Sequence, residues 1–257
     1  MLNVTDLGEG TAVLWVHGFP LASSIFENQL AIRRVRHVMP DLPGFGQSRP
    51  LGGEVTLDAY ARLMIELLDQ RGIDHAVFAG LSMGGYICFA AARLAPKRMR
   101  GLILLDTRET ADTDEQRQSR YDMIAKVQES GSVKQIVDGM LPKMLTPAAP
   151  RDTRDRVREI MGSSSPDGVV AALRAMAARP SFESLLPQID VPTLVIAGEQ
   201  DPITPPADAE RMVNGIRGAK LVRVAGAAHL ANYEKAAEVN RAITAFLAGR
   251  NTDSLTG

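Results

Sequence analysis

Six short apolar runs set the strongest limit on how this chain can fold. Each run is continuously apolar instead of alternating with polar residues, which is typical of strands covered on both faces in a parallel sheet. Helical patterns lie between the runs: residues 57–68 repeat apolar side chains every three or four positions, and Thr56 can cap their start. This order predicts an α/β fold, with a mostly parallel sheet and helices on both faces. The six runs are residues 12–16, 35–39, 76–79, 102–105, 193–197 and 221–224.

One long interval interrupts this alternation. Residues 107–190 show helical periodicity and no strand pattern. We therefore expect residues 1–106 and 191–257 to form the core, and residues 107–190 to form a helical cap inserted between two core strands. Three apolar stripes predict helices in this interval: Tyr121, Ile124 and Val127; Val133, Ile136, Val137, Met140 and Leu141; and residues 169–176. Six prolines are expected to interrupt helices or mark turns between them: Pro142, Pro147, Pro150, Pro166, Pro180 and Pro187.

The composition narrows the classes of function and partner. With 257 residues, 45% of them hydrophobic, the chain suits one domain with a large core. A formal net charge of -1 leaves no basic surplus for nucleic acid or an anionic membrane, and no apolar stretch approaches the roughly 18 residues that cross a bilayer. One cysteine, four histidines and no leader pattern predict a cytoplasmic protein without a disulfide, metal or organic cofactor. Monomer and homodimer both remain open.

The segment Gly80-Leu81-Ser82-Met83-Gly84 carries the strongest chemical signal. It has the spacing G-x-S-x-G, follows an apolar run directly and begins a helical pattern. A serine on such a tight turn has a strained backbone, and the small residues at 80 and 84 keep neighbouring backbone from clashing. The serine oxygen then projects from the top of the sheet. Ser82 is therefore the predicted nucleophile.

A serine hydroxyl needs a base within hydrogen-bond reach, and four histidines compete for this role. His229 follows the last apolar run in a loop, from which its side chain can reach the carboxyl edge of the sheet. His37 and His75 are expected to be structural or surface residues. His17 lies in the turn after the first run, and we interpret it as a loop organiser. His229 is therefore the predicted base.

The imidazole of such a base needs an acidic partner that fixes its tautomer and stabilises its charged form. Asp201 follows the apolar run at residues 193–197 and gives the chain order Ser, Asp, His. Asp106 is the alternative acid, because it ends the run at residues 102–105 on the same edge of the sheet. Alternatively, Asp106 is a structural residue that hydrogen-bonds the start of the cap. We predict Asp201 as the acid and keep Asp106 as its rival.

An acyl-transfer site also needs donors for a tetrahedral oxyanion. The backbone N–H of Met83, at the start of the helical pattern, is one predicted donor. The backbone N–H of Phe19, in the turn after the first apolar run, is the second. Because both roles use main chain, the side chains of Phe19 and Met83 are free to shape a pocket.

Taken in order, these motifs resemble those of the α/β-hydrolase superfamily over nearly the whole chain. They are the His17-Gly18 turn, the D-L-P-G-F-G-Q-S loop at 41–48, the serine turn, G-E-x-D at 198–201 and A-H-L at 228–230. Within the superfamily the chain is similar to the microbial group of 3-oxoadipate enol-lactonases, carboxylesterases and cofactor-free perhydrolases of the bromoperoxidase type. Only 16 residues precede His17, so we expect the opening hairpin of the family's sheet to be shortened, with the loss of a strand left open.

Residues and resemblance together predict a serine hydrolase that cleaves a small carboxylic ester or lactone through an acyl-enzyme intermediate. The expected pocket lies between the carboxyl edge of the sheet and the cap, with Phe19 and Met83 in its wall. Three alternative reactions remain open on the same scaffold: hydrolysis of a carbon–carbon bond, perhydrolysis of an acid, and hydroxynitrile cleavage. A fourth alternative is a ligand-binding sensor with negligible turnover.

Overall fold

The chain folds around one twisted sheet, whose strands run in the order β1-β3-β2-β4-β5-β6-β7 within the described residues. The structure is a computed structural model and describes residues 2–53 and 55–251. The strands are β1 (Val4–Leu7), β2 (Thr11–Val16), β3 (Val35–Pro40), β4 (Ala76–Leu81), β5 (Met99–Leu105), β6 (Thr193–Gly198) and β7 (Lys220–Val224). All neighbouring pairs are parallel except β1 with β3. This architecture is the α/β-hydrolase fold that the sequence predicts.

The N-terminal strand β1 is the part of the sheet that the apolar runs do not predict. It pairs antiparallel with β3, from Val4 opposite Pro40 to Leu7 opposite His37. It is short and only partly buried, so it lacks the continuous apolar pattern of the other strands. A single antiparallel strand therefore precedes β2, in keeping with the short opening segment expected from the sequence.

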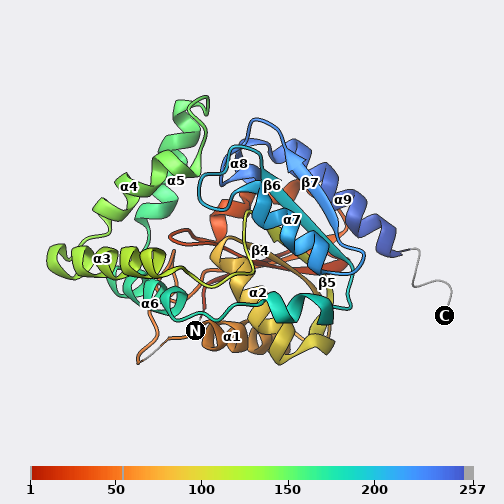
Figure 1. Cartoon of the computed structure of the whole chain (residues 1–257). Helices are drawn as coiled ribbons and strands as arrows, with labels where there is room; N and C mark the ends of the chain where they lie inside the picture. The colour runs from red at the N-terminus through yellow and green to blue at the C-terminus, as the bar shows by residue number, and fades with distance from the viewer. Residues whose placement is uncertain (1, 54, 252–257) are drawn as a thin grey trace.

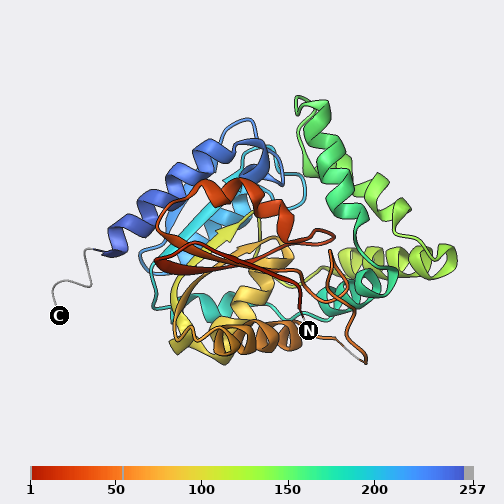
Figure 2. The same ribbon diagram turned by 180° about the vertical axis from the view of Figure 1, so that it is seen from behind.

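Helices cover both faces of the sheet, which explains the continuously apolar strands. Along β2, Leu14 and Val16 join one buried cluster and Val13 and Trp15 join the other. Helices α1 (Leu57–Gln70) and α2 (Met83–Leu94) cover the first face, and α9 (Ala236–Asn251) and the 3-10 helix η1 (Ser23–Ala31) cover the second (Figures 1 and 2). The remaining short helices are η2 (Pro96–Arg98), η3 (Glu183–Gln188), α7 (Pro206–Gly215) and α8 (Ala231–Glu234).

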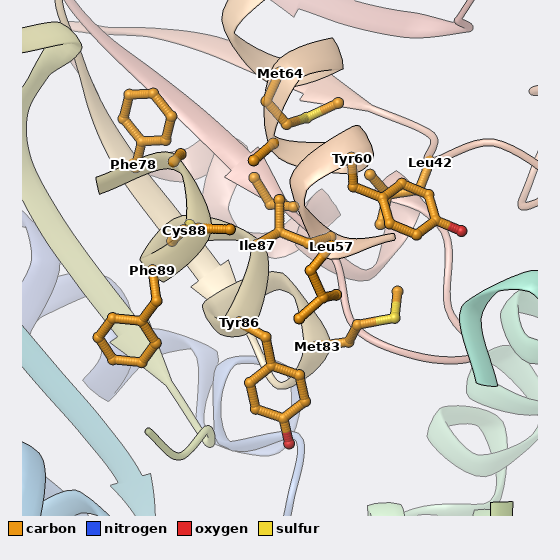
Figure 3. Packing of buried hydrophobic residues seen from close by; sticks show 14 of the residues in the cluster. Leu42, Leu57, Tyr60, Met64, Phe78, Met83, Tyr86, Ile87, Cys88 and Phe89 are labelled. Carbon is orange, nitrogen blue, oxygen red and sulfur yellow. The ribbon is translucent and has the colours of Figure 1, made fainter. Parts of the chain in front are cut away.

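Helix α2 is buried almost throughout, and its packing against α1 fixes the start of the helix under the carboxyl edge of the sheet. Figure 3 shows Leu57, Tyr60 and Met64 of α1 packed beside Ile87 and Cys88 of α2. Thr56 caps α1 by accepting the N–H of Ala59, as the sequence predicts. This packing holds the turn between β4 and α2 in place.

Four α-helices lie between β5 and β6, followed by η3, and we call these four α-helices the helical insertion. They are α3 (Asp114–Ser130), α4 (Lys134–Met144), α5 (Arg151–Gly162) and α6 (Pro166–Ala177). Helix α3 lies against α6, and α4 against α5, so the insertion consists of two helix pairs (Figure 1). Apolar residues of α3 and α6 join the buried cluster of α1 and α2, and those of α5 join the cluster of α9. Helix α4 contributes to both, with Ile136 in the first cluster and Val137, Leu141 and Met144 in the second.

The insertion corrects three details of the sequence prediction. Helix α5 was not predicted, because its buried residues are few among charged ones. Tyr121, expected in an apolar stripe, is 49% exposed, while Ile124 and Val127 are buried. Pro142 lies inside α4 instead of interrupting it, and the helix ends two residues later at Met144. A proline in the last turn removes one backbone donor only, which a helix end tolerates better than its middle.

Candidate active site

Ser82 occupies a strained turn between β4 and α2. Its backbone has φ 53° and ψ -116°, a conformation that costs an L-residue about 1–3 kcal/mol. A Cβ added at Gly80 would lie 2.5 Å from the backbone of Gly84, and one added at Gly84 would lie 1.9 Å from the carbonyl oxygen of Val16. The Ser82 N–H donates to the Leu105 carbonyl at 2.9 Å, which ties the turn to β5. The glycine spacing is therefore a steric requirement of this turn.

The structure brings Ser82, His229 and Asp201 together from three separate loops. The Ser82 hydroxyl lies 2.9 Å from His229 Nε2, and His229 Nδ1 lies 2.8 Å from Asp201 Oδ2. Because a carboxylate accepts at Nδ1, that nitrogen carries the proton and Nε2 is left to accept from Ser82. The loops follow β4, β6 and β7, so all three side chains meet at the carboxyl edge of the parallel strands.

Asp201 is surrounded by hydrogen-bond donors. Its Oδ1 accepts the N–H groups of Ile203 at 2.7 Å and Thr204 at 3.1 Å, and its Oδ2 accepts the Thr204 hydroxyl at 2.5 Å as well as the His229 ring. Burial by itself would raise the pKa of Asp201, but His229 and the Thr204 donors outweigh it and lower the pKa below its ordinary value. This carboxylate is held ionised and aimed at the imidazole.

His229 is almost completely buried, and opposing effects set its charge. Burial lowers the pKa of its ring, whereas the carboxylates of Asp201 and Asp106 raise it, and the resulting pKa lies above the ordinary value of 6.5. The imidazolium is therefore stabilised at the position where a proton taken from Ser82 would reside.

Asp106, the rival acid, points elsewhere. Its Oδ1 accepts the Gly198 N–H at 2.7 Å and its Oδ2 accepts the Ala231 N–H at 3.2 Å. It connects the end of β6 to the start of α8, and none of the described hydrogen bonds joins it to His229. Burial, followed by repulsion from nearby Asp201, raises its pKa. Of the two carboxylates, Asp201 is the one in contact with the imidazole.

His17 occupies the position of a loop organiser and lacks the contacts of a base. Its Nδ1 donates to the Gly18 carbonyl at 2.8 Å, and its Nε2 accepts the Leu42 N–H at 2.9 Å. Burial lowers its pKa to about 4, so the ring is neutral and both nitrogens are occupied. His37 is buried and His75 is exposed, and the ring of each bonds a backbone carbonyl.

The two predicted oxyanion donors come from segments adjacent to Ser82. A Cβ added at Gly18 would lie 2.9 Å from the Ser82 Cβ, so the turn that carries Phe19 lies directly against the serine. Met83 is the first residue of α2. No hydrogen bond of the described residues uses the backbone N–H of Phe19 or Met83. Both side chains are buried, and the Phe19 ring meets Phe45 edge-on at 6.3 Å between centroids.

Three residues near the site were not singled out from the sequence. Thr204 donates to Asp201 at 2.5 Å, and Thr107 donates to the Ser82 carbonyl at 2.7 Å. Arg108 bonds a backbone carbonyl in the Asp201 loop. The position of Thr204, three residues after an aspartate, is a recognisable turn signal. Thr107 and Arg108 have no comparable local signal, because their partners are distant in the chain.

The site contains no cluster of metal-binding residues. Within residues 2–53 and 55–251, no three His, Cys, Asp or Glu side chains are arranged to hold an ion. Among the helices described there, none has the length and apolarity needed to span a bilayer.

The chain is similar to known hydrolases over almost its whole length. The Alpha/beta hydrolase family matches residues 13–242. The AB hydrolase superfamily protein YisY of Bacillus subtilis is 30% identical, with 95% of this chain and 94% of that protein covered. A thermophilic esterase from Thermogutta terrifontis, solved with malate bound, has a TM-score of 0.94 and 35% identity, covering 97% of this chain and 93% of that one. The enol-lactonase from Burkholderia xenovorans LB400 has a TM-score of 0.87 and 25% identity, with 96% of both chains covered.

Proposed function

The chain belongs to the alpha/beta hydrolase family and is a hydrolase, and we propose that it cleaves small carboxylic esters or lactones through an acyl-enzyme intermediate on Ser82. The observation that carries this proposal is the continuous line of contacts from the Ser82 hydroxyl through both nitrogens of His229 to Asp201. The names of an esterase and an enol-lactonase among its relatives point to the same substrate class.

The geometry supports a two-step acyl transfer. His229 Nε2 takes the Ser82 proton while Oγ bonds to the substrate carbonyl carbon, and the carbonyl electron pair moves onto oxygen. The N–H groups of Phe19 and Met83 stabilise this oxyanion. The imidazolium then protonates the leaving alkoxide as the carbon–oxygen bond breaks. Water, deprotonated by the same imidazole, releases the acid and restores Ser82, and Asp201 stays ionised throughout.

The surroundings of Ser82 favour a small, largely apolar acyl group. Ser82 is only 8% exposed. The buried Met83 follows it directly, the turn of Phe19 lies against it, and the Phe45 ring packs on the Phe19 ring. We propose that residues 107–190 act as a cap over this site and that residues 1–106 and 191–257 form the catalytic core. Such a cap limits the size of the substrate and keeps bulk water out.

The proposal is tested with short-chain p-nitrophenyl esters and a matched panel of lactones. Wild type should hydrolyse at least one panel, and Ser82→Ala should remove the activity while leaving the unfolding curve within about 1 kcal/mol of wild type, since only one hydroxyl is lost. A fluorophosphonate probe should label wild type on Ser82, identified by peptide mass spectrometry.

Ser130→Ala is the matched control, because it removes an exposed hydroxyl that bonds only local backbone at the end of α3. It should keep full activity and labelling. A folded wild-type protein that is inert on both panels, with an unlabelled Ser82, would refute the ester and lactone proposal.

A further inference from the structure

Glu234, the last residue of α8, bridges the loop of His229 and the helical insertion. Its Oε2 accepts the N–H of Ala228, the residue directly before His229, at 2.8 Å. Its Oε1 accepts both the N–H and the hydroxyl of Thr146, at 2.9 Å and 2.6 Å. Thr146 lies just beyond the end of α4, so one carboxylate joins two segments that are more than 80 residues apart in the chain.

A second bond holds the other side of the same loop. The N–H of Leu230, directly after His229, donates to the carbonyl of Met144 at 3.0 Å. Met144, Leu145 and Thr146 are all buried, and Leu145 belongs to the same apolar cluster as Leu230. Both neighbours of His229 are therefore attached to the short segment at residues 144–146.

Helix α5 also binds the segment at residues 144–146. Arg154 of α5 donates to the carbonyls of Thr146 at 2.6 Å and Ala149 at 3.2 Å. The segment is thus bound to α5 through Arg154 and to the histidine loop through Glu234. A displacement of the α4–α5 pair would therefore move the loop that carries His229.

We propose that Glu234 is a positioning residue that makes the placement of His229 depend on the docking of the α4–α5 helix pair. The proposal rests on the proposed function, in which His229 is the base. His229 must hold Ser82 at 2.9 Å and Asp201 at 2.8 Å at the same time. A displacement of about 1 Å in such an arrangement costs about 100-fold in rate, so the bonds that flank the base matter for turnover.

The charge of Glu234 makes it suited to this task. A carboxylate forms stronger hydrogen bonds to N–H and O–H donors than a neutral acceptor does, and it accepts at both oxygens at once. The loop it holds contains Gly226 at φ 66° and has no helix or strand of its own between β7 and α8. External bonds therefore decide where the loop lies.

The test compares three variants on the intact protein. Glu234→Ala removes both sets of bonds. Glu234→Gln keeps one oxygen and presents N–H groups to a donor, so it breaks one side of the bridge. Thr146→Val removes the hydroxyl bond and keeps the backbone bond, with little change in volume. Glu238→Gln on α9 is the matched control, because it removes the same charge one turn further along from a residue whose side chain makes none of the described hydrogen bonds or ion pairs.

We expect Glu234→Ala to lower kcat about 100-fold and Glu234→Gln about 10-fold, with KM changed less than about threefold, because the base is displaced while the acyl pocket remains. Thr146→Val should lower kcat about threefold. Combining it with Glu234→Ala should add nothing, since both act through one bridge. Glu238→Gln should match wild type.

A spectroscopic readout separates positioning from simple stabilisation and does not depend on turnover. The proton shared by His229 Nδ1 and Asp201 should give a strongly deshielded ¹H resonance in wild type, which broadens or shifts in Glu234→Ala and stays in Glu238→Gln. Loss of thermal stability in Glu234→Ala with kcat and this resonance unchanged would overturn the proposal. If wild type is catalytically inert, the proposed function fails. The response of the resonance to Glu234→Ala then still tests whether Glu234 positions His229.

Discussion

Replacing Asp201 by Asn should remove nearly all activity, and the reason lies in the donors that surround this side chain. One oxygen accepts two backbone N–H groups, from Ile203 and Thr204, and the other accepts the Thr204 hydroxyl and the His229 ring. An amide has only one oxygen, so its NH₂ group must face one of these two pairs.

The two orientations differ in cost. If the NH₂ group faces the two backbone N–H groups, two buried donors lose their acceptor, at about 1–3 kcal/mol each. If it faces the other side, the Thr204 hydroxyl rotates to accept, and His229 must present an unprotonated Nδ1. The second orientation is cheaper, and it moves the ring proton to Nε2. The ring can then no longer accept the proton of Ser82, and a triad in this wrong tautomer loses about 10⁴-fold in kcat, or about 5.5 kcal/mol.

The assay measures kcat on the best p-nitrophenyl ester and the free energy of unfolding in urea, for Asp201→Asn and for Asp106→Asn. Asp106→Asn should leave one of the Gly198 and Ala231 N–H groups without an acceptor and so lose about 1–3 kcal/mol of stability, with kcat within about tenfold of wild type. If Asp106→Asn is the inactive variant, or if Asp201→Asn keeps near wild-type kcat, the reasoning from donor geometry is refuted.

Three further predictions follow from buried groups. Burial lowers the pKa of His229, but the nearby carboxylates outweigh it and raise the pKa above 6.5. Because only the neutral ring can take a proton, kcat/KM should fall as the pH decreases, with a midpoint above pH 6.5. A midpoint below pH 6.5 would count against this prediction. Burial lowers the pKa of His17 to about 4, so the unfolded chain gains a proton first, and about 3 kcal/mol of stability should be lost as pH falls from 6.5 to 4. Urea unfolding should show about 2 kcal/mol of this loss between pH 7 and pH 5 in wild type and a smaller loss in His17→Gln; equal losses would contradict the reasoning. Gly84→Ala should cost about 3 kcal/mol because its Cβ would meet a backbone oxygen at 1.9 Å, whereas Gly139→Ala in α4, with nothing within 4 Å, should gain up to about 1 kcal/mol in the same assay.

The sheet was predictable because burial on both faces leaves a strong mark on sequence. Continuous apolar runs predicted β2 to β7, and the glycine spacing around Ser82 predicted the turn, since a steric requirement admits few residue types. Strand β1 was missed because it is short and half-buried. Its pairing with β3 is set by tertiary contact and not by a local pattern.

The sequence favoured Asp201 as the acid but could not exclude Asp106. Asp106 and Asp201 follow neighbouring strands of the same edge, so topology alone brings both close to His229. What distinguishes them is the direction of each carboxylate: Asp106 has φ 42° and turns toward two backbone amides, while Asp201 turns toward the ring. The bridge made by Glu234 could not be predicted from the sequence either, because it joins segments that are far apart in the chain.

The single entry and single exit of the helical insertion, between β5 and β6, have an evolutionary consequence. Ser82 follows β4, Asp201 follows β6 and His229 follows β7, so recombination could exchange the whole insertion without altering any strand that carries these three residues. With the insertion in its proposed role as a cap, substrate preference and bond-breaking chemistry could thus diversify separately. The hydroxyl and amide of Thr146 restrict this freedom: an incoming insertion must bring equivalent donors to Glu234, or the loop of His229 loses one of the bonds that hold it.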